Sequence, residues 1–169
     1  MPISERLDIA KKHIQSAREY TLTNVQDLDV DDWFWMPESQ TSHIAWQVGH
    51  LAMAQYGLTL FRQRGRLTED KQLMSASFRK RFMKGTVANP NREDHPQPEE
   101  ILSVLNRVNE QMLAEIDSFD GEQLDEPIEM PYSVSPTRYG SLIFAGDHEM
   151  LHAGQIGMLR RLMGKDPIR

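Results

Sequence analysis

The sequence predicts an all-α protein, a four-helix bundle with long crossover connections, on three observations. Apolar residues recur every three or four positions in four segments of roughly 20 residues each. Strand-like alternation of apolar and polar residues is scarce. Polar stretches broken by proline and glycine separate the later segments. Amphipathic helices of this length bury their apolar faces against one another, so we expect one bundle.

The first two helices are expected near residues 4–25 and 41–65. Ser4 suits the N-cap of the first helix, and Thr41 or Ser42 that of the second, because a hydroxyl oxygen can accept a hydrogen bond from the first turn. Gly65 would end the second helix. The inner faces would hold Leu7, Ala10, Ile14, Ala17 and Leu22 in the first helix, and Ile44, Val48, Leu51, Leu58 and Phe61 in the second.

The last two helices are expected after Pro98 and from Gly140 or Ser141 to Met163. Proline suits a first helical turn, and Gly164 makes a natural stop. The inner face of the third helix would hold Ile101, Leu102, Leu105, Val108, Met112, Leu113, Ile116 and Phe119. The connections 66–98 and 120–138 are too polar for long helices, and we expect them to shape the mouth of a pocket.

Composition narrows the function classes. The length suits a single domain over residues 1–169, and the net charge of −6 with a pI near 5.5 disfavours nucleic acid and membrane surfaces as partners. Cysteine is absent, so a metal would need histidine or carboxylate ligands. No apolar run approaches the roughly 20 residues of a membrane span, and the expected location is cytoplasmic. A small-molecule substrate remains the expected partner.

The segment HEMLH at residues 148–152 carries the strongest functional signal. His148 and His152 are four residues apart, so on a helix both imidazoles lie on one face and can bind one metal ion. Glu149 occupies the position of the general base in zinc peptidases. We treat it as a candidate catalytic residue, although it would point about 80° away from the mean direction of the two histidines.

The third ligand of a peptidase-type site does not follow this segment. Metzincins carry glycine and histidine three and six residues after the second histidine, where this chain has Gln155 and Met158. The acidic residue that follows, Asp166, lies beyond the expected helix end. A third ligand must therefore come from another helix.

His50 is the best candidate for that ligand because it lies in the middle of the apolar second helix. His43 lies two turns earlier, about 10 Å along the axis, so at most one of the two can bind the same ion. We expect His43 to cap the helix, hydrogen-bond or line the mouth, and His13 and His95 to be solvated. The alternative is that these histidines are ordinary core residues and that the spacing arose by chance.

Two stretches resemble the DinB (DinB/YfiT-like) superfamily. They are WQVGHL at residues 46–51 and HEMLHAGQI at residues 148–156, followed by LRRLMG at 159–164. The resemblance implies a four-helix bundle, commonly a homodimer, with a divalent ion such as Zn, Ni or Fe held by His50, His148 and His152. Characterised relatives include enzymes that use bacillithiol, mycothiol or glutathione.

The resulting hypothesis is a metal-dependent S-transferase that joins a low-molecular-weight thiol to a small electrophile. Three imidazoles leave a coordination position open for thiol or substrate. Two alternatives are a metal-dependent hydrolase with Glu149 as base, and a non-catalytic metal-binding protein of the stress response. The basic run 79–84 could bind carboxylates of the thiol, and Asp147 and Gln155 could support the metal ligands. The pocket mouth could include Tyr132, Arg138 and Tyr139.

Overall fold

The computed structural model describes residues 1–38, 42–130 and 135–168. Within these ranges it is helical, without a β-strand, and its one β-type pairing is an isolated bridge between Pro127 and Thr137. The all-α class is therefore confirmed. None of the described helices is both long enough and apolar enough to cross a membrane.

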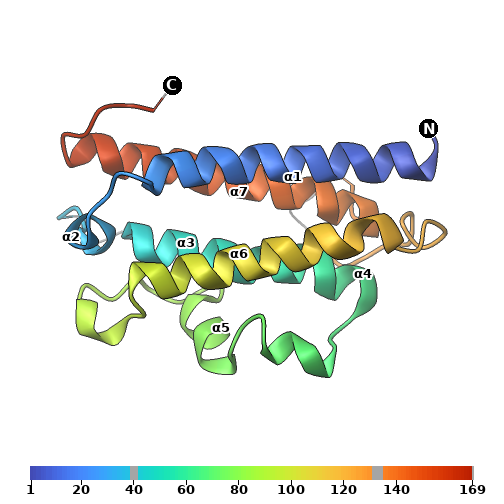
Figure 1. The fold of residues 1–169 in the computed structure, drawn as a ribbon, viewed down its shortest axis with the longest axis horizontal. Coiled ribbons are helices and arrows are strands. Elements are labelled where there is room, and N and C mark those ends of the chain that lie inside the picture. The colour runs from blue at the N-terminus through green and yellow to red at the C-terminus, as the bar shows by residue number, and fades with distance from the viewer. Residues whose placement is uncertain (39–41, 131–134, 169) are drawn as a thin grey trace.

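Four long helices dominate the structure (Figure 1). They are α1 (Ile3–Val25), α3 (Ile44–Tyr56), α6 (Pro98–Glu115) and α7 (Arg138–Leu162). The π-helical turn η1 (Gly57–Phe61) and α4 (Arg62–Arg64) prolong α3, and the 3₁₀ turn η4 (Ile116–Ser118) prolongs α6. The connections contain the short elements α2 (Val30–Phe34), η2 (Thr68–Lys71), α5 (Ala76–Phe82) and η3 (Arg92–Asp94).

The helix ends differ from the expected N-caps at three places. The first helix begins at Ile3, so Ser4 lies inside it. The second begins at Ile44, and its cap is His43, whose Nδ1 accepts a hydrogen bond from the Trp46 N–H at 3.0 Å. The fourth begins at Arg138 behind a Thr137 cap. The unprotonated nitrogen of a neutral imidazole can accept the capping hydrogen bond as a hydroxyl oxygen does. Histidine is not among the preferred N-cap residues Ser, Thr, Asp and Asn, so residue preferences alone do not indicate this cap.

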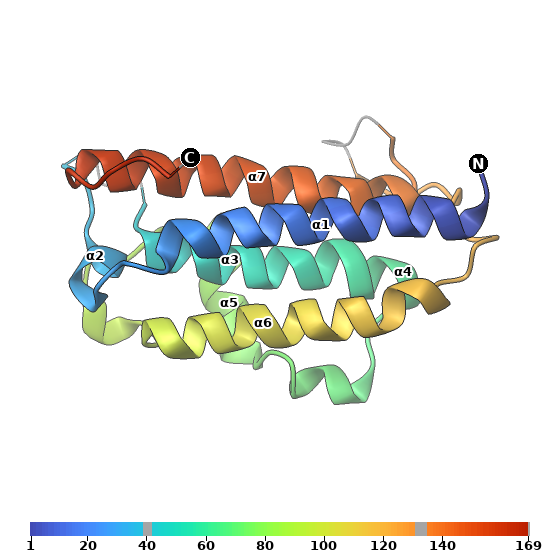
Figure 2. The ribbon, with the colours of Figure 1, turned by 45° about the horizontal axis from the view of Figure 1, so that its top comes forward.

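The packing order explains the long connection between α4 and α6. In Figures 1 and 2 the chain runs one way along α1 and α7 and the opposite way along α3 and α6. The helix α1 packs against α7, and α3 packs against both α6 and α7. Because α3 and α6 run in the same direction, the chain must return along the whole length of the molecule between them. Residues 65–97 make this return and lay α5 against α3.

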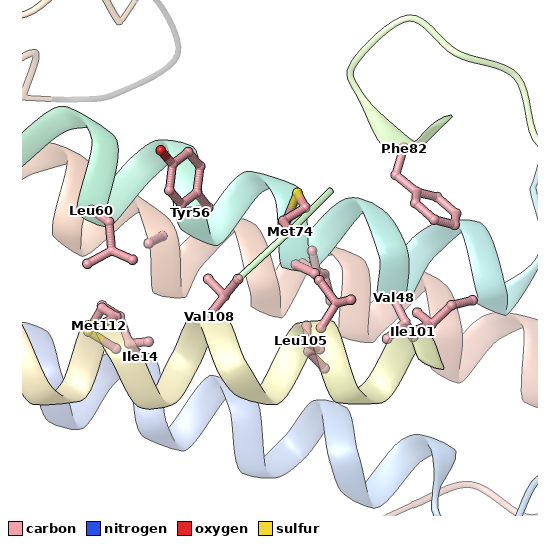
Figure 3. Close-up of a cluster of buried hydrophobic side chains, with 14 of the residues drawn as sticks. Ile14, Val48, Tyr56, Leu60, Met74, Phe82, Ile101, Leu105, Val108 and Met112 are labelled. Carbon is pink, nitrogen blue, oxygen red and sulfur yellow. The ribbon is translucent and has the colours of Figure 1, made fainter. Parts of the chain in front are cut away.

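The core fills the space between these helices (Figure 3). The expected inner residues of α1, namely Leu7, Ala10, Ile14 and Ala17, are buried, and Leu22 is partly buried. In the second helix Ile44, Val48 and Leu51 are buried, whereas Leu58 is partly buried and Phe61 is 50% exposed. These two residues line a pocket.

Gly49 allows α5 to pack closely against α3. A Cβ at this position would lie 2.6 Å from the ring of Phe82, well inside van der Waals contact, so a larger residue would push the ring away. Figure 3 shows Phe82 pointing toward α3 from the α5 side. The same approach brings the Phe82 carbonyl oxygen within 2.7 Å of His50 Nδ1. The glycine beside His50 therefore has a structural reason.

Candidate metal centre

His50, His148 and His152 meet between α3 and α7. One nitrogen of each ring lies within 4.8 Å of the corresponding nitrogens of the other two. Nitrogens that share one ion lie roughly 3–4 Å apart, because each bond is about 2.1 Å long. Within residues 1–38, 42–130 and 135–168 this is the group of three side chains with metal-binding geometry. The structure thus brings together the three histidines expected from the sequence.

Hydrogen bonds to Nδ1 orient two of the three rings. His50 Nδ1 contacts the Phe82 carbonyl oxygen at 2.7 Å, and His152 Nδ1 contacts the side-chain oxygen of Gln47. Since both oxygens can only accept, each Nδ1 carries the proton and donates. The lone pair of Nε2 is then free to bind a metal, as in many sites where an acceptor behind the ring fixes the tautomer.

Burial keeps the three imidazoles neutral. Burial, with a smaller contribution from charge repulsion by the neighbouring histidines, lowers the pKa of His148 to about 4 and that of His152 to about 3. Burial also lowers the pKa of His50, against which the Trp46 ring stacks at 4.9 Å between centroids. Three neutral imidazoles with free lone pairs are a donor set that suits divalent zinc, nickel or iron.

The histidine group opens into a pocket of about 970 Å³. His50 and His148 line this pocket, and His152 does not. The side chain of His148 forms no hydrogen bond to any described residue, and Phe144 lies one turn before it. An ion held by the three rings would therefore have its remaining coordination positions on the pocket side, where a small molecule can reach it.

The Glu149 carboxylate pairs with Arg18 and not with the histidine group. Its two carboxylate oxygens accept hydrogen bonds from Arg18, at 2.6 Å from Nε and 3.0 Å from Nη2, and both side chains are at most 4% exposed. Arg18 also donates to the carbonyl oxygen of Leu105 and to Gln55. The pair thus links all four long helices. Sequence reasoning missed Arg18, although a charged residue next to Ala17 on the apolar face of the first helix is a signal for a buried partner.

Other predicted support residues also point away from the histidine group. Asp147 pairs with His13 at 2.9 Å on the surface, and Gln155 is exposed.

Arg138, expected at the pocket mouth, binds Glu126 and the carbonyl oxygens at the end of α4. Tyr139 lies under the guanidinium of Arg6. The described residues that line the pocket include neither Arg138 nor Tyr139. Tyr132 lies outside the described residues, and of the basic run 79–84 Lys84 alone reaches the pocket.

A second pair of histidines, His43 and His95, is buried at the start of α3. The Nε2 atoms of both contact the same acceptor, the carbonyl oxygen of Asn89, at 3.0 and 2.7 Å. The prediction that His43 caps the helix is confirmed. The prediction that His95 is solvated is wrong, since the residue is 8% exposed and packs against Phe34. Its loop folds back onto the helix, which local sequence does not reveal.

His43 should make the metal-free protein sensitive to acid. Burial is the main cause that lowers its pKa from 6.5 to about 4. Between these values the unfolded chain binds the proton and the folded protein does not, so stability falls as the pH falls from about 6.5 to about 4. The His43 contribution is a loss of about 2 kcal/mol between pH 7 and pH 5.

Urea unfolding at the two pH values in the presence of a chelator would measure this loss. His43→Asn keeps a side chain that can cap the helix, so the variant is expected to lose about 2 kcal/mol less than the wild type over the same interval. If His43→Asn lost as much free energy of unfolding between pH 7 and pH 5 as the wild type does, the assignment to His43 would be contradicted.

An all-helical protein with a three-histidine group at a pocket is the class that this fold and site define. The chain matches the model of the DinB superfamily over residues 13–156, and it belongs to that superfamily. A solved structure, described as the conserved protein of locus from Enterococcus faecalis, superposes with a TM-score of 0.62. It is 20% identical, and the match covers 94% of this chain and 97% of that one, so the two share a fold. No curated protein matches the chain.

Proposed function

We propose that this protein is a metal-dependent enzyme that transfers a low-molecular-weight thiol to a small electrophile, with a divalent ion held by His50, His148 and His152. The observation that carries the proposal is the geometry of these rings. They are neutral, two of them are oriented by hydrogen bonds to Nδ1, and the group faces a pocket that a small molecule can enter.

A divalent ion bound there would lower the pKa of a coordinated thiol and hold the sulfur ready for attack at neutral pH. The thiol R–SH and the electrophile R′–X would form a new S–C bond, while the S–H and C–X bonds break and the proton leaves with X. His50 and His148 would present the reacting sulfur to the pocket. Its apolar walls, including Met53 and Phe144, would keep water away from the electrophile.

Glu149 has a positioning role in this proposal. A general base must come within hydrogen-bond reach of the proton that it removes, and both oxygens of this carboxylate are bound by Arg18. Glu149 does not line the pocket among the described residues. We therefore assign it to holding α7 against α1, rather than to the base function that a hydrolase would require.

The test is turnover of the protein loaded separately with Zn(II), Ni(II) or Fe(II), with a panel of thiols and 1-chloro-2,4-dinitrobenzene as electrophile. We expect product formation that needs both metal and thiol and that disappears in His148→Ala. Glu149→Gln, once its folded fraction is measured, should retain the activity per folded molecule. No metal-dependent reaction with any thiol, in protein that binds metal, would favour a non-catalytic role. Ester hydrolysis lost in folded Glu149→Gln would favour the hydrolase.

The homodimer and the cytoplasmic location remain predictions. A dimer would require a surface that two copies share, and sedimentation of the purified protein would measure the oligomeric state directly.

A further inference from the structure

The pocket beside the histidines follows one face of a continuous helical stretch. The residues that α3, η1 and α4 contribute to its wall recur at intervals of three and four, as expected for one helix face. They are His50, Met53, Ala54, Gly57, Leu58, Phe61 and Arg62. Phe144 and His148 of α7, residues 128–130 and Lys84 form the rest of the wall. The pocket is therefore an elongated groove between α3 and α7.

The two ends of this groove differ in chemistry. His50 and His148 lie at one end, and Arg62, twelve residues after His50, lies at the other. At 1.5 Å per residue the ends are about 18 Å apart along the helix. The wall between them is apolar and remains accessible, since Phe61 is 50% exposed and Met53 and Leu58 are only partly buried.

A π-helical turn shapes the middle of the groove. In η1 the hydrogen bonds of the α-helix are interrupted, and the hydroxyl of Ser141 donates to the carbonyl oxygen of Leu58 at 2.7 Å. Such turns are frequent at functional sites, because they widen a helix locally. Gly57 begins this turn, and a Cβ there would meet no atom within 4 Å. The absence of a side chain at Gly57 thus leaves the groove open.

Arg62 lacks the carboxylate partner that comparable arginines have. Among the described arginines that are buried or half-buried, the others each pair with an aspartate or glutamate: Arg6, Arg18, Arg64, Arg138 and Arg160. Within the described part of the chain, the Arg62 side chain donates one hydrogen bond, to the carbonyl oxygen of Glu129 at 3.2 Å. A guanidinium has five N–H donors, so several remain for an anion. Lys84 adds a second cation to the wall, and with the Glu129 carboxylate the charges there sum to plus one.

We propose that the groove binds an elongated apolar molecule with a carboxylate at one end, which Arg62 holds, and a reactive group at the other end, beside His50 and His148. An extended carbon chain advances about 1.3 Å per bond, so a chain of roughly ten to twelve carbons spans about 11–14 Å and leaves the remaining length for the contact between carboxylate and guanidinium and for the approach to the imidazoles. The proposal rests on the proposed function, since it names the substrate class of that site. It excludes small polar electrophiles as the preferred substrates, because they would leave most of the apolar wall uncovered.

Calorimetric titration of metal-free protein with decanoate, hexanoate, decanol and decylamine tests the proposal. We expect decanoate to bind more tightly than hexanoate, by up to about fourfold for each methylene, and about tenfold more tightly than decanol. Decylamine should bind more weakly than decanol. Arg62→Gln should remove the preference for decanoate over decanol and leave decanol binding unchanged.

A matched pair of glycine variants locates the binding. Gly57→Leu adds a side chain in open space and in helical backbone, so it should fill the groove and reduce decanoate binding at least tenfold without loss of stability. Gly154→Leu makes the same change on the exposed face of α7 and should have no effect. Normal decanoate binding by Gly57→Leu, or an unchanged preference in Arg62→Gln, would overturn the proposal.

The metal-free protein separates this proposal from the proposed function. Decanoate binding with the expected preferences in a protein that takes up no metal would refute the metalloenzyme alone. Metal uptake and thiol turnover in a protein that binds decanoate no better than decanol would refute the substrate class alone.

Discussion

His148→Ala is expected to lower the affinity for Zn(II) by more than about 100-fold. Loss of a residue that only hydrogen-bonds to a metal ligand typically lowers the affinity about 10- to 100-fold, and loss of the ligand itself should lower it more. His148 is the cleanest position for this test. Its ring forms no hydrogen bond to a described residue, so its removal should disturb the fold little. His50→Ala should have a similar effect on affinity, but it also leaves the Phe82 carbonyl oxygen without its donor.

Gln47→Leu should lower the affinity for Zn(II) less than His148→Ala does. Gln47 accepts the hydrogen bond from His152 Nδ1, so its loss frees the ring to rotate and removes the preference for the right tautomer. A decrease in affinity of about 10- to 100-fold is expected.

Competition with a chromophoric chelator at pH 7 would measure these affinities, with melting temperature as a check on folding. His13→Ala is the matched control, because His13 is a histidine of the same domain that pairs with Asp147 on the surface. It should bind Zn(II) as the wild type does. Equal affinities in His148→Ala and the wild type would show that the three rings do not hold the ion.

Arg18→Met is expected to lower the free energy of unfolding by about 3–5 kcal/mol. It leaves the Glu149 carboxylate buried, 2% exposed and without its cationic partner, and unpaired buried charges carry penalties of this size. The substitution also removes the hydrogen bonds to Gln55 and to the carbonyl oxygen of Leu105. The methionine side chain keeps much of the packing volume, so the cavity contribution stays small.

A double variant separates charge from packing. Arg18→Met combined with Glu149→Leu removes both charges and should recover most of the lost stability, because a buried ion pair is often replaceable by apolar residues of similar size. Urea unfolding followed by circular dichroism would give the free energies. A loss below about 1 kcal/mol in the single variant, the range of an exposed salt bridge, would show that water reaches the pair.

The four long helices could be predicted because each depends on local information. The inner residues of α1, from Leu7 to Ala17, recur at helical spacing and are buried as expected. Pro98 opens α6 and Gly164, with φ of 81°, follows α7, because backbone preferences of these residues are local. The π-turn in the second helix escaped prediction. Its hydrogen bond from Ser141 comes from a residue more than eighty positions away.

In the candidate site, too, local sequence predicts one part and tertiary packing decides the other. The i and i+4 spacing of His148 and His152 places them on one face of a helix without reference to the rest of the chain, and the sequence by itself determined that pair together with the helical class. Which other histidine joins them was a choice between His43 and His50, and tertiary packing decided it by placing α3 against α7.

The tertiary structure alone also decided the roles of the charged residues. Glu149 follows His148 in the chain, yet it faces Arg18 of another helix, and no local pattern pairs residues that are 131 positions apart. Arg62 gains its proposed function from lying at the far end of a groove whose other wall is α7. Helix formation follows from interactions within a few residues, whereas burial, charge pairing and pockets arise only when distant segments pack together.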